Sequence, residues 1–329
     1  MGDFELWREQ MTSNALRKVL MLVASSLCAV LLNLTTARAY DLPLGINLGF
    51  TSFLDGGPPA GPGLYFTQYF QYLHSDSFKD KDGHTIPFPS PDLNAYISLS
   101  QFIYQSNQPV LLGGKWGVDL IIPIVGIDLS YATPGPFPSA NDPGFGDILV
   151  GPYIQWDPIM GENGPIFMHR IELQTTFPTG RYDRNKNLNP GSNSFTFNPY
   201  WAATLFITPK WTASARFHYL WASENDEPFG GGGTSQAGQA IHFNYASEYE
   251  IIPKMLRFGV NGYYLKQITD TQADGHGVPG DKEQVFAIGP GALFSFSQDN
   301  HIFFNAYFEM AAENRPESTR LNLRWVHHF

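Results

Sequence analysis

Polar and apolar residues alternate with a period of two along most of the chain. Between Trp211 and Trp221 the odd positions are aromatic or apolar, whereas Thr212, Ser214, Arg216 and His218 occupy even positions. Successive side chains of a strand point to opposite faces, so this pattern predicts strands with one apolar and one polar face. Twelve runs of this kind follow residue 63: Leu64–His74, Leu93–Ser106, Lys115–Leu129, Asp147–Asp157, Phe167–Phe177, Phe195–Ile207, Trp211–Trp221, Ile241–Ile251, Met255–Gln267, Val285–Phe296, Ile302–Met310 and Leu321–Phe329.

The connections between these runs are alternately short and long. Short turns are expected at Asn107–Leu111, Pro158–Pro165, Thr208–Lys210, Pro253–Lys254 and Gln298–Asn300. Long loops are expected at Ser75–Asp92, Ala132–Gly146, Pro178–Asn193, Asn225–Gln239 and Thr269–Lys282. Short periplasmic turns and long outer loops are the usual asymmetry of outer-membrane barrels, so both termini are predicted to lie in the periplasm.

The distribution of aromatic and charged residues favours a barrel in lipid over a soluble sandwich. The apolar faces carry aromatic residues at the strand ends, and the opposite faces carry full charges. Aromatic residues make up 15% of the chain, which also has 32 Gly and 25 Pro, a composition that suits many strands joined by turns. The predicted fold class is therefore all-β: a transmembrane antiparallel β-barrel of about twelve strands over residues 63–329.

The last run, Leu321–Phe329, places Trp325 and Phe329 on one face and Arg324 on the other. A barrel needs such a strand to close against the first one, because an open edge in hydrocarbon leaves backbone groups unpaired. The run resembles the C-terminal signature of bacterial outer-membrane barrels, from which His327 departs. That resemblance implies recognition of Phe329 by the barrel-assembly machinery. The alternative is an edge strand of a soluble sandwich.

Residues 1–39 have the features of a secretory signal peptide. Arg17 and Lys18 precede an apolar run, and Ala37-Arg38-Ala39 provides a small-residue cleavage site. The single cysteine, Cys28, lies in this leader, so no disulfide or cysteine metal site is expected in the remainder. The leader holds four of the 20 basic residues and three of the 30 acidic ones, which leaves 16 against 27. This acidic balance argues against binding of nucleic acid.

Residues 40–62 form an irregular segment rich in Gly and Pro, yet it is apolar at Ile46, Leu48, Phe50 and Phe53. We interpret this segment as an internal plug or gate that enters the barrel from the periplasmic side, with these four side chains as its apolar contacts. A disordered leader is the alternative.

Several short motifs in this order resemble a known family of outer-membrane proteins. They are Ala60-Gly61-Pro62-Gly63-Leu64-Tyr65-Phe66, Asp76-Ser77-Phe78-Lys79-Asp80-Lys81-Asp82-Gly83, Gly113-Gly114-Lys115-Trp116-Gly117, Gly144-Phe145-Gly146-Asp147 and Phe177-Pro178-Thr179-Gly180-Arg181-Tyr182. The family is associated with the meta-pathway of phenol degradation. The resemblance implies a porin-like transporter in the outer membrane of a Gram-negative bacterium, for passive uptake of small apolar or aromatic compounds.

If the aromatic faces meet lipid, the opposite faces line the lumen. The predicted lumen and substrate-path residues are Lys115, Asp119, Tyr153, Arg170, Glu172, Tyr200, Arg216, His218, His242, Glu248, Arg257, Glu309 and Arg324, and Tyr96, Tyr263 and Tyr307 fall on the same side. Both charge signs occur, so a simple anion- or cation-selective ring is not indicated. The charged residues equally suit a network of ion pairs that fills a narrow barrel.

Other functions leave weaker traces in the sequence. Asp76, Asp80 and Asp82 share one loop but lack the spacing of a dedicated calcium loop, so no metal site or cofactor is predicted. Ser214 and His218 share one lumenal face, but a hydrolase also needs a group that orients the histidine, and no catalytic residues are assigned. A general diffusion pore or a structural barrel remain alternatives to the transporter.

Overall fold

The computed structural model describes residues 46–58 and 60–329. The predicted signal peptide 1–39 and residues 40–45 of the irregular segment lie outside these ranges. The described residues form strands and turns: β1 (Gly63–Phe78), β2 (Asp92–Pro109), β3 (Lys115–Ser130), β4 (Gly144–Phe145), β5 (Ile148–Gln155), β6 (Ile159–Gly161), β7 (Gly164–Phe177), β8 (Thr196–Phe206), β9 (Trp211–Ala222), β10 (Ser235–Gln236), β11 (Ala240–Ile252), β12 (Leu256–Gln267), β13 (Gln272–Ala273), β14 (His276–Gly277), β15 (Gln284–Ser295), β16 (Asn300–Glu313) and β17 (Pro316–His328). Within these residues, no helix is both long and apolar enough to cross a membrane.

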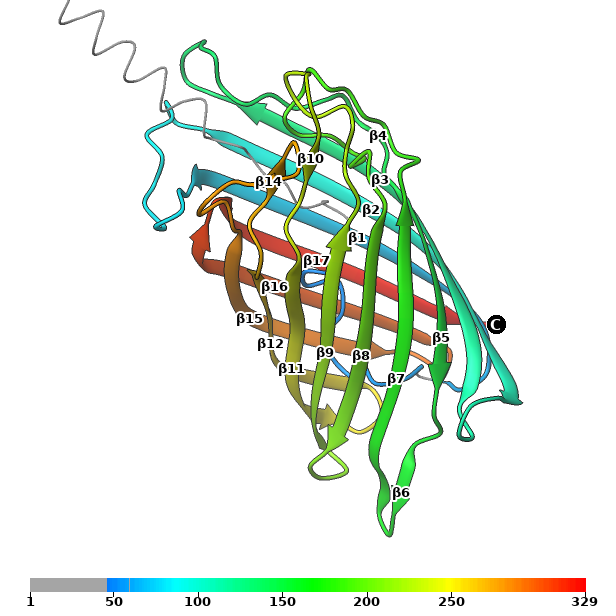
Figure 1. Cartoon of the computed structure of the whole chain (residues 1–329). Coiled ribbons are helices and arrows are strands. Elements are labelled where there is room, and N and C mark those ends of the chain that lie inside the picture. Colours follow the sequence, from blue (N-terminus) through cyan, green and yellow to red (C-terminus); the bar gives the residue numbers. More distant parts are fainter. Residues whose placement is uncertain (1–45, 59) are drawn as a thin grey trace, which may run out of the picture. The chain divides into compact units, whose positions relative to one another are not determined.

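Twelve long antiparallel strands form a closed barrel (Figure 1). Each strand pairs with the next long strand along the chain, and β1 closes the ring by pairing with β17. In this closing pair Phe66 lies opposite His327, and Tyr72 lies opposite Leu321. The N–H of Phe329 donates to the carbonyl of Leu64 at 3.0 Å. The prediction of an all-β barrel of about twelve strands is therefore confirmed.

Several strand boundaries differ from the predicted ones by a few residues, and two of these differences add paired residues at turns. β17 begins at Pro316, five residues before the predicted run, and only Asn314 and Arg315 separate it from β16. Asn314 accommodates the tight turn with a positive φ of 52°. At the other end of the barrel, the turn expected at Pro158–Pro165 instead contains the short strand β6, which pairs with the start of β7. Pro316 and Glu317 obscure the start of β17, although Ser318 and Arg320 continue the polar face of the later positions.

Loops at the opposite end carry some structure of their own. Strands β10, β13 and β14 form a small sheet that joins the loop after β9 to the loop after β12. β3 pairs with β5 as far as Ile121, and beyond this point it pairs with the two-residue β4. The long loops thus gather at one end, as the sequence predicts, and the short turns lie at the other, except for the tight turn at Asn314 and Arg315.

The two faces of the wall have opposite chemistry. On β9 Phe217 is 47% exposed, whereas the adjacent Arg216 is 3% exposed. Large apolar side chains point outward all around the barrel, among them Phe70, Leu205, Ile241, Phe258 and Phe304. An apolar belt of this extent is incompatible with water and suits the hydrocarbon of a bilayer.

Candidate functional site

The described part of the irregular segment, residues 46–58, lies inside the barrel (blue in Figure 1). Ile46, Leu48, Phe50 and Phe53 are all at most 5% exposed. Ile46 and Leu48 belong to an apolar cluster with inward side chains of β9, β11, β12, β15 and β16, and Phe53 belongs to a second cluster nearer the short turns. These four side chains therefore pack against the inner wall.

Polar groups of the wall hold the backbone of this segment. The Asn244 side chain on β11 accepts the N–H of Gly49 at 3.0 Å and donates to the side chain of Asn47 at 2.9 Å. On the far side of the lumen, Gln71 donates to the carbonyl of Leu48 at 3.3 Å. A chain without regular structure must satisfy its backbone groups in this way once it is removed from water.

Farther along, the segment meets β8 and β5. The N–H of Gly56 donates to Thr204 at 2.9 Å, and Gln155 donates to the carbonyl of Gly56 at 3.0 Å. Because these contacts and those of Asn244 and Gln71 come from separate parts of the wall, the segment spans the lumen.

One buried ion pair joins the segment to the wall. Arg216 donates from Nε and Nη2 to the two carboxylate oxygens of Asp55, at 2.8 and 2.6 Å. The side chains are only 4% and 6% exposed. The guanidinium also lies over the Tyr200 ring, 4.0 Å from its centre, and the Tyr200 hydroxyl donates to Glu172. Such a two-pronged pair fixes both position and orientation of the chain at Asp55.

A second charged cluster lies near the long loops. Glu309 accepts Arg320 at 3.0 Å and the Tyr263 hydroxyl at 2.6 Å, and Arg315 lies 3.8 Å away. Arg315 also pairs with Glu283 at 3.2 Å. All these side chains are buried, so this cluster fills the barrel at that end rather than lining an open path.

A cavity of about 400 Å³ lies between the inserted segment and the short-turn end of the barrel. Phe53, Leu54 and Asp55 form one side of it. The wall contributes both rings and charges, including Tyr65, Tyr69, Phe303, Arg170 and Arg324. We call this cavity the lower chamber. It offers an apolar surface with several cationic groups beside it.

The predicted lumen residues are inward-facing with few exceptions. Asp119, Tyr153, Arg170, Glu172, Tyr200, Arg216, His218, His242, Glu248, Glu309 and Arg324 are all buried. Lys115 and Arg257 are partly exposed near the short turns, where they pair with Asp157 at 2.7 Å and Glu250 at 3.5 Å. Whether any of these residues contacts a solute stays a prediction.

The interpretation of Tyr96 as a lumen residue is wrong. Its side chain is 57% exposed and packs against Tyr72 on the outer surface, with the ring centres 5.2 Å apart. Tyr263 and Tyr307, by contrast, are fully buried. In β2 the two neighbours of Tyr96 along the chain are Ala95 and Ile97, which are buried and apolar. The contrast between polar and apolar residues therefore assigns Tyr96 to the wrong face of the strand.

Hydrolase geometry is not present at the candidate serine and histidine. The Ser214 hydroxyl is bonded to Thr204 at 2.9 Å. His218 bonds to Asn198 at 3.2 Å and stacks on His242, with ring centres 4.1 Å apart. Within the described residues Ser214 and His218 share no hydrogen bond, so neither can activate the other in this arrangement.

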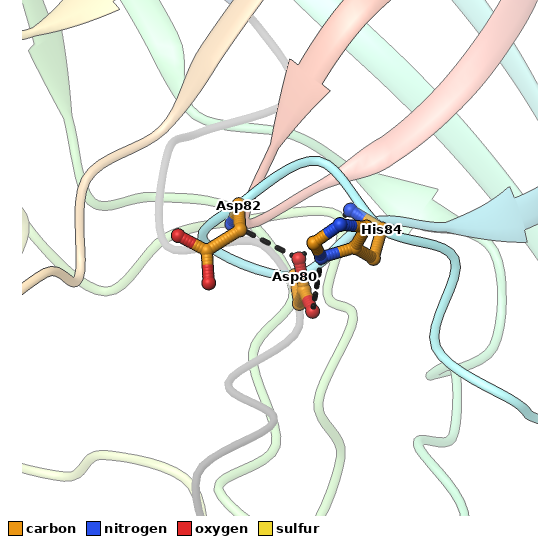
Figure 2. Close-up of side chains that lie close together, drawn as sticks. All are labelled: Asp80, Asp82 and His84. Atoms are coloured by element: carbon orange, nitrogen blue, oxygen red, sulfur yellow. Dashed lines mark hydrogen bonds and ion pairs between the residues drawn. The ribbon is translucent and has the colours of Figure 1, made fainter.

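The acidic loop after β1 brings Asp80, Asp82 and His84 together (Figure 2). One Asp80 oxygen already accepts the backbone N–H groups of Asp82 and His84, both at 2.9 Å. Desolvation raises the pKa of the Asp80 carboxyl, but these two hydrogen bonds outweigh it, so the pKa lies below its ordinary value. The Asp82 carboxylate pairs with Lys81 at 2.7 Å. These contacts explain the cluster as a local turn.

The sequence pattern does not identify some interior residues. Asp55 does not stand out, because its partner Arg216 is 161 positions away. Arg315 and Arg320 precede the predicted last run and therefore lie outside the predicted strand faces. Leu220 and Leu265 are buried apolar residues on inward faces, which the search for polar lumen residues passes over. Of these features, the sequence can reveal only the earlier start of β17, because Ser318 and Arg320 continue the polar face of Asn322 and Arg324.

A closed barrel of twelve antiparallel strands, with an apolar outer belt and a polar interior, is a membrane-spanning barrel of the outer-membrane type. A model of the family described as "Putative MetA-pathway of phenol degradation" matches residues 75–325, and the chain belongs to this family. No curated protein matches the sequence.

A solved channel structure agrees on the fold. The COG4313 outer membrane channel from Pseudomonas putida F1 is similar with a TM-score of 0.71 and 18% identity, over 84% of this chain and 98% of that one. A deltaS2 mutant of the TodX monoaromatic hydrocarbon channel gives a TM-score of 0.48 and 8% identity, over 86% of this chain and 96% of that one.

Proposed function

We propose that this barrel admits small apolar or aromatic compounds through the outer membrane, down their concentration gradient, with residues 46–58 as an internal gate. The observation that carries the proposal is the occupied lumen. An irregular segment crosses it, buries Leu48, Phe50 and Phe53 there, and leaves the lower chamber beneath. The family description, which names phenol degradation, supports aromatic compounds as the solute class.

The chemistry of the interior suits apolar solutes better than hydrated ones. A general diffusion pore needs a continuous water-filled path. Here, apolar clusters that include Ile46, Leu48 and Phe53 interrupt the polar interior. An apolar solute gains free energy on leaving water for such a site, whereas a sugar would lose hydrogen bonds. The same contacts that occlude the lumen therefore provide selectivity.

In this proposal, the Asp55–Arg216 pair is the contact that holds the gate closed. Removing one partner leaves the other charge buried without compensation, at a cost of about 3–5 kcal/mol. The segment is short and lacks secondary structure, so a penalty of this size favours its release from the wall over unfolding of the barrel. Glycine residues at positions 49, 56 and 57 let the backbone rearrange without breaking a strand.

Single-channel conductance of the refolded protein in planar bilayers tests whether this ion pair holds the gate closed. We expect D55N and R216Q each to raise the time spent in a conducting state several-fold. The double variant should spend only slightly more time in the conducting state than either single variant, because both changes remove the same interaction. K210Q, in an exposed turn, serves as the control. If D55N conducts like the unchanged protein, the ion pair does not hold a gate.

Catalysis is not part of the proposal, and the barrel is taken to work without a cofactor. The outer-membrane lipids surround the belt, and Phe329 is proposed to serve recognition by the barrel-assembly machinery.

A further inference from the structure

The lower chamber is more cationic than the rest of the molecule. Five basic side chains line it: Arg170, Arg216, Lys254, Arg257 and Arg324. Of the residues that the structure describes, only two carboxylates line it, Asp55 and Glu250. The whole chain has 20 basic and 30 acidic residues, so this local excess of positive charge opposes the overall balance.

Both lining carboxylates are already engaged. Asp55 takes two hydrogen bonds from Arg216, and Glu250 lies 3.5 Å from Arg257. Among the described residues, no carboxylate lies within ion-pair distance of Arg170 or Arg324. Lys254 is exposed at the chamber entrance, so water can solvate its ammonium group. The two arginines cannot be solvated in the same way, because they are 9% and 7% exposed.

Each of these arginines retains unused binding capacity. The Nε atoms of Arg170 and Arg324 are buried and have no hydrogen-bond partner. A buried guanidinium donor without a partner costs free energy that an anionic ligand could recover. Arg170 lies on β7 and Arg324 on β17, with four long strands of the closed wall between the two on one side and six on the other. They therefore line the chamber from well-separated parts of the wall.

Aromatic rings set the orientation of both guanidinium groups. The Arg324 head lies 3.6 Å from the centre of the Phe303 ring. The Arg170 head lies 5.3 Å from the Tyr153 ring centre and 5.6 Å from that of Tyr200. Stacking of this kind holds the planar fork in place and leaves its edge available for a carboxylate.

The nearby acidic residues do not supply the missing partner. Asp119 accepts Gln101 at 2.7 Å, Glu172 accepts Gln174 at 2.8 Å, and Glu248 accepts Thr212. None of these three carboxylates lines the chamber. The oxygens that do accept hydrogen bonds take them from neutral donors in the wall, so on the chamber surface the basic side chains still outnumber the carboxylates.

We propose that the lower chamber binds the carboxylate of a small aromatic acid, with Arg170 and Arg324 as the anion-binding groups. The ring of the acid packs on the apolar side chains of Phe53, Phe303 and Leu293, and its carboxylate accepts from the guanidinium edges. This inference rests on the proposed function and names, among its small aromatic solutes, a preferred class, namely those that carry one negative charge.

Calorimetric titration of the refolded, detergent-solubilised protein with benzoate and with benzyl alcohol tests the inference. The two probes share ring and size but differ in charge. We expect benzoate to bind the unchanged protein at least ten-fold more tightly, and to lose affinity as salt is raised. Equal affinities for the two probes would overturn the inference. This comparison uses only the unchanged protein, so its outcome does not depend on whether a variant folds.

Variants then locate the site. R170Q and R324Q should each weaken benzoate binding by about ten-fold, the usual effect of losing one hydrogen bond to a charged group. Affinity for benzyl alcohol should change little. K210Q removes a charge outside the chamber and should bind benzoate normally. Undiminished benzoate binding by R170Q and R324Q, each checked for the heat-modifiable folded form, would also overturn the inference.

Uptake into liposomes separates this inference from the proposed function. If the barrel admits benzyl alcohol and benzoate without preference for the acid, the carboxylate site is wrong but the transport proposal stands. If it admits neither compound above protein-free liposomes, the proposed function itself fails.

Discussion

At the scale of single residues, burial decides which charges matter. Arg216 pairs with Asp55, Arg320 pairs with Glu309, and both pairs are shielded from water. In contrast, Lys81 and Asp82 form an ion pair that is more than half exposed, and such pairs contribute little to stability. The Asp55–Arg216 pair therefore fixes the inserted segment to the wall, and the Glu309–Arg320 pair joins β16 to β17.

Gly49 offers a test of close packing inside the lumen. A Cβ at this position would lie 2.7 Å from a ring carbon of Tyr307, and the residue has a φ of +77°. Gly61 shares a positive φ of +89°, yet its Cβ would meet nothing within 4 Å. We expect G49A to displace the segment and raise channel conductance at least two-fold, and G61A to leave it near normal. Equal conductance of the two variants would show that the tyrosine contact is unimportant.

Phe217 tests the register of the wall. Its outward side chain is 47% exposed, so we assign it to the lipid. A lysine or arginine near the bilayer midplane costs about 2–4 kcal/mol and an aspartate less, so F217D should lower the free energy of unfolding by about 2 kcal/mol, whereas F217L should lower it by less than about 1 kcal/mol. Urea titration of protein folded in lipid vesicles measures both. A small effect of F217D would mean that this face does not meet lipid.

At the scale of elements, the strand faces could be predicted from sequence but the contacts between elements could not. The period of two places Phe217 and Arg216 on opposite faces of β9 without further information. It fails at Tyr96, where both neighbours are apolar, and it does not reveal that inward Leu220 and Leu265 pack with Leu48. Such contacts depend on an aperiodic segment, whose partners only the closed barrel brings together.

The closing strand provides the prediction at this scale. Phe329 donates its N–H to the carbonyl of Leu64, and its ring packs edge-on against His327, with ring centres 4.5 Å apart. Deleting Phe329 should reduce the yield of the heat-modifiable barrel in cell membranes several-fold, while F329Y should assemble nearly as well as the unchanged protein. Full assembly of the deletion variant would remove the support for a terminal recognition signal.

At the scale of the whole molecule, the two faces of the barrel wall have different environments. The outer belt is apolar, and the interior holds a mixture of ion pairs, aromatic rings and the apolar side chains of the inserted segment. In the proposed function, the segment closes the direct path for water and creates a site for a less hydrated solute. Its removal should therefore increase conductance and decrease selectivity together.

The most direct test of this account compares two solutes in two forms of the protein. Liposomes carrying the full mature barrel, or a variant that lacks residues 40–58, are assayed for uptake of phenol and of a small sugar. We expect the full barrel to admit phenol but little sugar, and the shortened barrel to admit both at similar rates. If both forms pass the two solutes alike, the segment is no gate and the barrel is a general diffusion pore.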